Sequence, residues 1–96
     1  MFPASQGNYD VAQTSYQDAL KICEERLGKD HPEVASYLNN LAGLLREKGQ
    51  YIDAKPLYES ALEIREKKLG SEHPDVAISL NNLAMLLQSQ VMMSIP

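Results

Sequence analysis

One stretch of this sequence occurs twice, and this repeat constrains the fold more than any other feature. Residues 27–45 read LGKDHPEVASYLNNLAGLL, and residues 69–87 read LGSEHPDVAISLNNLAMLL. The two stretches lie 42 positions apart, and identities at the same offset also precede them, such as Tyr16 with Tyr58. A fixed period of this size indicates an array of stacked units, each of which buries its apolar face on a neighbour.

The spacing of apolar residues predicts that the chain is all-α. Apolar side chains recur at intervals of three and four residues, which is typical of helices. A proline opens the second and fourth of the predicted helices, and a glycine follows each of the first three. Pro56 lies in the second turn of the third helix, where we expect it to bend the helix or delay its start. The predicted helices span about residues 8–27, 32–48, 51–69 and 74–90 and run antiparallel.

Charge and cysteine content exclude several classes of protein. The net charge of −4 argues against nucleic acid or an anionic membrane surface as a partner. No apolar run approaches the roughly 18 residues that a membrane span needs. Cys23 has no second cysteine to pair with, which fits a reducing compartment. We therefore expect a soluble, cytoplasmic chain with no nucleic-acid and no membrane partner.

A helical wheel divides the second helix into an apolar arc and a free arc. The apolar arc predicts the core and holds Val34, Ala35, Leu38, Leu41, Ala42, Leu44 and Leu45. The free arc holds Ser36, Asn39, Asn40, Gly43, Arg46 and Glu47. The fourth helix repeats the division, and its free arc holds Ile78, Asn81, Asn82, Met85, Gln88 and Ser89. One face of each helix should pack, and the other should be available to a ligand.

The motif around LNNLA identifies a family resemblance. With HPEVA before it and a helix beginning Gly-Gln-Tyr after it, the chain resembles the tetratricopeptide repeats of kinesin light chains and nephrocystin-like proteins, which use a 42-residue unit. The resemblance covers about residues 7–90 and implies a right-handed α-α superhelix. It assigns the second and fourth helices as first helices (A) of a repeat, and the first and third as second helices (B).

The order B-A-B-A leaves only one complete repeat, flanked by two halves. The half repeats are residues 7–31 and 74–90, and the full repeat is residues 32–69. We expect residues 1–6 to be a disordered N-terminal segment and residues 91–96 to be a tail outside the repeat pattern.

The resemblance also implies a concave groove, lined by the A helices, that binds peptides. In related proteins, asparagines on these helices hydrogen-bond the backbone of an extended peptide, since a carboxamide carries both a donor and an acceptor. On the wheel, Asn39 and Asn81 point most directly at the groove. An alternative role for the asparagines is to fix the stacking of neighbouring helices. Carried over by position, the peptide-binding residues are Asn39, Asn40, Gly43, Arg46, Ile78, Asn81, Asn82 and Met85.

Two features of the free arcs do not decide which kind of ligand binds. Ile78 and Met85 could receive one apolar side chain of a peptide, and packing in an assembly explains them equally well. Arg46 could attract an acidic ligand, but Glu47 beside it opposes that attraction.

No residue pattern indicates catalysis, a metal site or a cofactor site. His31 and His73 each precede a proline at a helix start, so we interpret them as helix-terminus residues whose acidic neighbours serve as capping partners. Cys23 matches Arg65 at the repeat offset, which predicts a partly exposed thiol. We therefore expect a chain that is not an enzyme and uses no cofactor.

Both ends of the array keep the interior repeat pattern. Each could expose a few hundred Å² of apolar surface, about the limit for a monomer. A tail folded over the fourth helix, or the rest of a longer array, would also cover such a face. The residues concerned are Leu80, Leu83 and Leu87 at one end and Tyr9, Tyr16 and Leu20 at the other.

Two hypotheses of function follow. The first is a non-catalytic scaffold that binds an extended peptide or a partner protein in the groove. The second is a structural repeat that assembles into a homo-oligomer, head-to-tail or swapped, through its uncapped terminal helices and holds no groove ligand.

Overall fold

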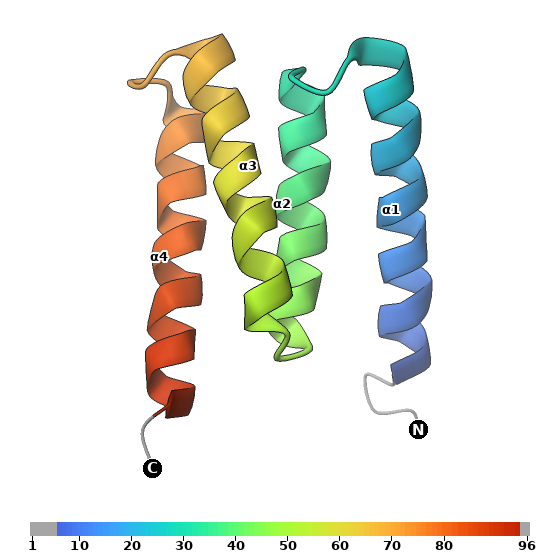
Figure 1. Cartoon of the computed structure of the whole chain (residues 1–96), viewed down its shortest axis with the longest axis vertical. Helices are drawn as coiled ribbons and strands as arrows, with labels where there is room; N and C mark the ends of the chain where they lie inside the picture. The colour runs from blue at the N-terminus through green and yellow to red at the C-terminus, as the bar shows by residue number, and fades with distance from the viewer. Residues whose placement is uncertain (1–5, 95–96) are drawn as a thin grey trace.

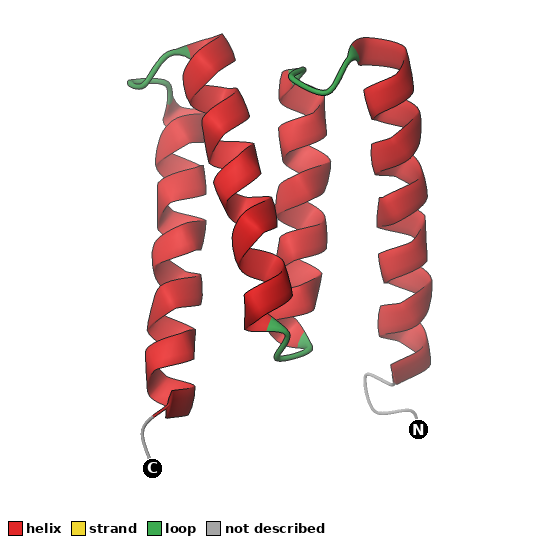
Figure 2. Ribbon diagram, in the orientation of Figure 1, coloured by secondary structure: helices red, strands yellow, loops and turns green. Residues whose placement is uncertain are grey.

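Four α-helices form the fold. The computed structural model describes residues 6–94 of the chain, and within that range it contains no strand. Figures 1 and 2 show the helices running alternately up and down, joined by short loops. The predicted all-α class is confirmed. The helices are α1 (Gln6–Leu27), α2 (Pro32–Glu47), α3 (Tyr51–Leu69) and α4 (Pro74–Ser94).

Histidine rings mark the starts of α2 and α4. Nδ1 of His31 accepts a hydrogen bond from the backbone N–H of Glu33 at 3.1 Å, and Nδ1 of His73 accepts one from the N–H of Asp75 at 3.0 Å. The proline that follows each histidine has no N–H, which costs nothing at the first helical position. The histidines are helix-terminus residues, as predicted, but the ring itself caps the helix in place of a neighbouring acid.

Two predictions about helix limits differ from the structure. Of the two effects expected of Pro56, a bend or a delayed start, the delay does not occur, because α3 begins at Tyr51 and continues through the proline. The fourth helix was expected to end near Gln90, yet α4 runs to Ser94. The position where a turn glycine would stand is occupied by Val91, so no residue there favours a stop. The predicted disordered segment lies outside the described residues, except for Gln6, which opens α1.

The core of the molecule is built on α2. The backbone of this helix lies close to those of α1, α3 and α4. The backbone of α1 lies close to that of α2 and to no other described helix. All seven residues predicted on the apolar arc of α2 are buried. One core cluster joins Cys23, Val34, Ala35, Leu38, Ala61 and Ile64, and the other joins Leu41, Ala42, Leu45, Ala54, Tyr58 and Leu86.

Packing on α3 leaves the free arcs of α2 and α4 on the opposite side. Figure 1 shows α3 in front of both helices, and contacts between α2 and α4 place these two side by side. Most of each asparagine-bearing arc therefore lies outside the main contact with α3. Ser36 and Gly43 of the α2 arc still lie beside Arg65 and Tyr58 of α3.

Candidate functional site

An open pocket of about 350 Å³ lies on the free arc of α2. Residues of all four helices contribute to its walls, because α2 lies among the other three. Five of the residues predicted from the resemblance meet here: Asn39, Asn40, Gly43, Arg46 and Asn82. The remaining lining residues are Ala12, Tyr16, Leu44, Glu47 and Tyr58.

Three predicted residues of α4 lie outside this pocket. Ile78, Asn81 and Met85 are exposed, and Nδ2 of Asn81 lies 3.5 Å from the sulfur of Met85. Asn39, the repeat counterpart of Asn81, lines the pocket because α4 lies beside α2. No described helix lies on the other side of α4 in the same way, so Asn81 faces open surface. Asn82 is the asparagine of α4 that lines the pocket.

The amide of Asn39 is the most unusual polar group in the pocket. Its Oδ1 is enclosed by protein atoms and accepts no hydrogen bond from a described residue. A buried acceptor without a donor costs about 1–3 kcal/mol. Within residues 6–94, the side chains of Asn39, Asn40 and Asn82 form no hydrogen bond to a neighbouring helix. Among the described residues, therefore, no hydrogen bond of these asparagines fixes the stacking.

The pocket lining includes charged residues of both signs. Arg46 and Glu47 both line it, and Arg46 is partly buried while Glu47 is exposed. The pocket lining thus contains one cation and one anion, so its formal charges sum to zero. The pocket wall therefore offers amide, aromatic and mixed-charge groups with no dominant sign.

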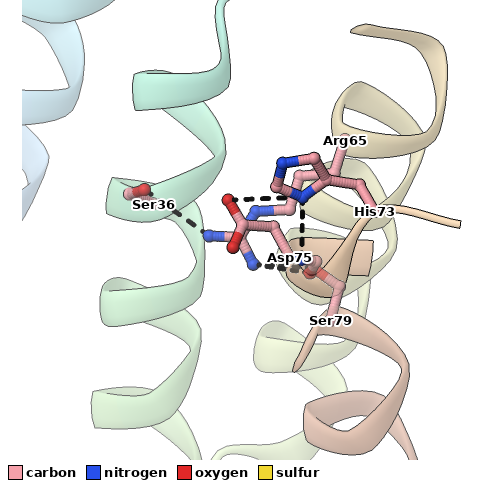
Figure 3. Close-up of polar contacts among 5 residues, drawn as sticks. All are labelled: Ser36, Arg65, His73, Asp75 and Ser79. Carbon is pink, nitrogen blue, oxygen red and sulfur yellow. Dashed lines mark hydrogen bonds and ion pairs between the residues drawn. The ribbon is translucent and has the colours of Figure 1, made fainter. Parts of the chain in front are cut away.

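Arg65 is a polar residue whose position the sequence reasoning missed. It was matched to a partly exposed Cys23, but both side chains are only 8% exposed, so that expectation was wrong. Nη1 of Arg65 donates to Oγ of Ser79 at 3.0 Å and to the carbonyl oxygen of Asp75 at 3.2 Å. Nη2 reaches Oγ of Ser36 on α2 at 3.5 Å, and Figure 3 shows the side chain bridging between the helices.

A coupled exchange of side-chain sizes explains how Arg65 fits. At the α1–α2 contact, the small Cys23 is packed near the large Tyr37. At the equivalent α3–α4 contact, the large Arg65 lies against the small Ser79. Cys23 corresponds to Arg65 and Tyr37 corresponds to Ser79, each 42 positions apart. Comparing these two pairs in the sequence could therefore have revealed the contact between Arg65 and Ser79.

Two other classes of function lack the groups that they require in the described part of the chain. No three His, Cys, Asp or Glu side chains within it are arranged to hold a metal ion. None of its helices has the length and apolar character required to cross a membrane.

Comparison with known proteins gives a separate line of support for the repeat. A family model described as tetratricopeptide repeat matches residues 4–67 and, a second time, residues 35–90. The two matches overlap and together cover most of the chain, as expected where the repeating unit is iterated. No curated protein matches the chain significantly.

Proposed function

The chain belongs to the tetratricopeptide repeat family, and from this premise we propose that it is a non-catalytic scaffold that binds an extended segment of a partner protein. Tetratricopeptide repeats generally mediate protein–protein interactions. We place the ligand on the pocket of α2 and α4. The 42-residue period supports a unit of the kinesin light chain type, and the free Cys23 fits a cytoplasmic setting.

The observation that carries the proposal is the enclosed, unpaired Oδ1 of Asn39 in a pocket that also contains Asn40 and Asn82. A peptide backbone presents one N–H and one C=O per residue, and a carboxamide can pair with both. Rotation of the Asn39 amide would bring its acceptor to a peptide N–H. Such contacts recognise the backbone of an extended segment and require no particular side chain.

The size of the site limits the strength of binding. One pocket of about 350 Å³ accommodates a few residues of a peptide, and a stable protein interface buries more than about 1,000 Å². We therefore expect weak binding to isolated peptides.

The test begins with selection of binders from a random peptide library on the wild-type chain. A selected peptide is then titrated by calorimetry against the Asn39→Leu variant, which keeps the number and branching of the side-chain heavy atoms and removes the amide. We expect the affinity to fall about fivefold, the value of one lost neutral hydrogen bond. The melting temperature should not fall, because the substitution removes an unpaired buried oxygen.

Asn81→Leu is the matched control, because it makes the same change at the equivalent position of α4, outside the pocket. Its affinity for the peptide should equal that of the wild type. If the asparagines act in helix stacking instead, Asn39→Leu will lower the melting temperature and leave the peptide affinity unchanged. That result, or a library that yields no binder, would reject the proposed site.

A further inference from the structure

The outer face of α4 exposes the side chains that α2 buries. Leu38 and Leu45 are 7% and 6% exposed, because α3 covers them. Their counterparts Leu80 and Leu87 are 50% and 41% exposed. Val91, at 60% exposure, extends the same stripe along α4 at helical spacing. The alanines between these leucines follow the same rule: Ala35 and Ala42 are buried, and Ala77 and Ala84 are exposed.

The positions of α1 that correspond to the α2-facing positions of α3 show the complementary difference. Ile64 of α3 is 7% exposed in its contact with α2, and its counterpart Ile22 is 59% exposed. The other α3 side chains in that contact are buried, whereas their α1 counterparts are only partly buried. The pairs are Ala54 with Ala12, Tyr58 with Tyr16, and Ala61 with Ala19.

We infer that α4 of one molecule binds α1 of a second copy in the way that α2 binds α3 within the chain. The internal α2–α3 contact shows what covers such a face. On each molecule the α4 half of that contact is exposed, and the α1 half is only partly covered. The contact is heterologous, so successive molecules form an open chain or a closed ring. This inference rests on other observations than the proposed peptide site, although Ala12 and Tyr16 belong both to the α1 face and to the lining of that pocket.

Charge distinguishes the contact between copies from its internal counterpart. Within the chain, Nζ of Lys67 on α3 pairs with Oδ2 of Asp30 at 2.9 Å, before the start of α2. Lys67 corresponds to Glu25 on α1, one repeat period earlier in the chain, and Asp30 corresponds to Glu72 before α4, one period later. Docking α1 on α4 therefore brings two carboxylates together where the internal contact has an ion pair. The association between copies is accordingly weaker than the internal contact.

The first test is sedimentation across a wide range of protein concentration. The average mass of the wild type should rise with concentration. Glu25→Lys replaces the repulsion by a lysine–glutamate pair and should strengthen association about threefold. Glu59→Lys makes the same change of charge at an exposed position of α3, outside both faces, and should leave the association unchanged.

The second test identifies the two faces by complementation. Leu80→Glu disables the α4 face, and Ile22→Glu disables the α1 face; both residues are exposed, so each variant should fold with unchanged circular dichroism. Each variant alone should remain a monomer. Mixed together, the two should form a dimer and nothing larger, because one intact face of each kind remains.

Three outcomes would overturn the inference. The wild type could sediment as a monomer at every concentration, or Glu25→Lys could fail to strengthen association. The third is self-association by Ile22→Glu alone, which would mean that two α4 faces bind each other.

Discussion

Burial controls the chemistry of Cys23. The thiol lies in the core cluster between α1, α2 and α3, and this burial raises its pKa above the usual value. The carboxylates of Glu33 and Glu24 raise the pKa further, because a thiolate beside them would be repelled. Since the thiolate is the reactive form, the folded chain should protect this residue from oxidation and alkylation.

We predict that Ellman's reagent modifies Cys23 in the folded chain at least about tenfold more slowly than in urea. Because the folded-state pKa is raised, the rate should increase only at a pH above the range of an ordinary thiol. The unfolded chain ionises first, so stability should decrease as the pH rises past the usual thiol pKa. Equal rates for the folded and unfolded chains would show that the thiol is accessible.

Single residues also show which parts of the site could be predicted from the sequence. The free arc of α2 was predictable because a helical wheel requires only residue spacing, and five of its six predicted residues line the pocket. The difference between Asn81 and Asn82 was not predictable, since it depends on which side of α4 a neighbouring helix occupies. The burial of Arg65 depends on a partner in another helix, Ser79, which spacing within α3 does not identify.

At the scale of helices, stop and start signals determined how well the limits could be predicted. The turn glycines have positive φ angles, which other residues rarely adopt, and Gly28 and Gly70 follow α1 and α3 accordingly. No such residue follows Gln90, and α4 continues to Ser94. The pattern of apolar residues shows that a helix exists, but a terminus depends on local chemistry that a repeat comparison can only suggest.

The contact between α3 and α4 can be tested by exchanging its side chains for those of the contact between α1 and α2. Arg65→Cys should destabilise the chain by about 1–3 kcal/mol, because Ser79 loses its donor and a void remains. Ser79→Tyr should cost a similar amount by overpacking around Arg65. The double variant should be more stable than either single variant, since it recreates the Cys23–Tyr37 combination.

Urea denaturation of the four proteins provides the measurement. A coupling of at least about 0.5 kcal/mol between the two positions would support the exchange of volumes. Additive losses would mean that Arg65 and Ser79 contribute to stability separately, despite the 3.0 Å hydrogen bond.

At the scale of the whole molecule, stability should decrease from the centre of the array towards its ends. In stacked repeats each unit is held by its neighbours, so local opening begins where neighbours are fewest. Among the described helices, the backbone of α2 lies close to those of three others, and the backbone of α1 lies close to that of α2 alone. We predict that amide hydrogens of α2 and α3 exchange most slowly and those of α1 fastest. Equal protection of all four helices would show a single cooperative unit instead.

Hydrogen exchange also links this gradient to association between copies. If α1 of one molecule covers α4 of another, a higher protein concentration should slow exchange in these two helices and leave α2 and α3 nearly unchanged. Leu80→Glu should abolish that concentration dependence, because it disables the α4 face without touching the core. A concentration effect confined to α4 would instead indicate that the α4 faces pair with each other. If instead both α1 and α4 are protected, the exposed apolar stripe of α4 is the surface through which the copies assemble.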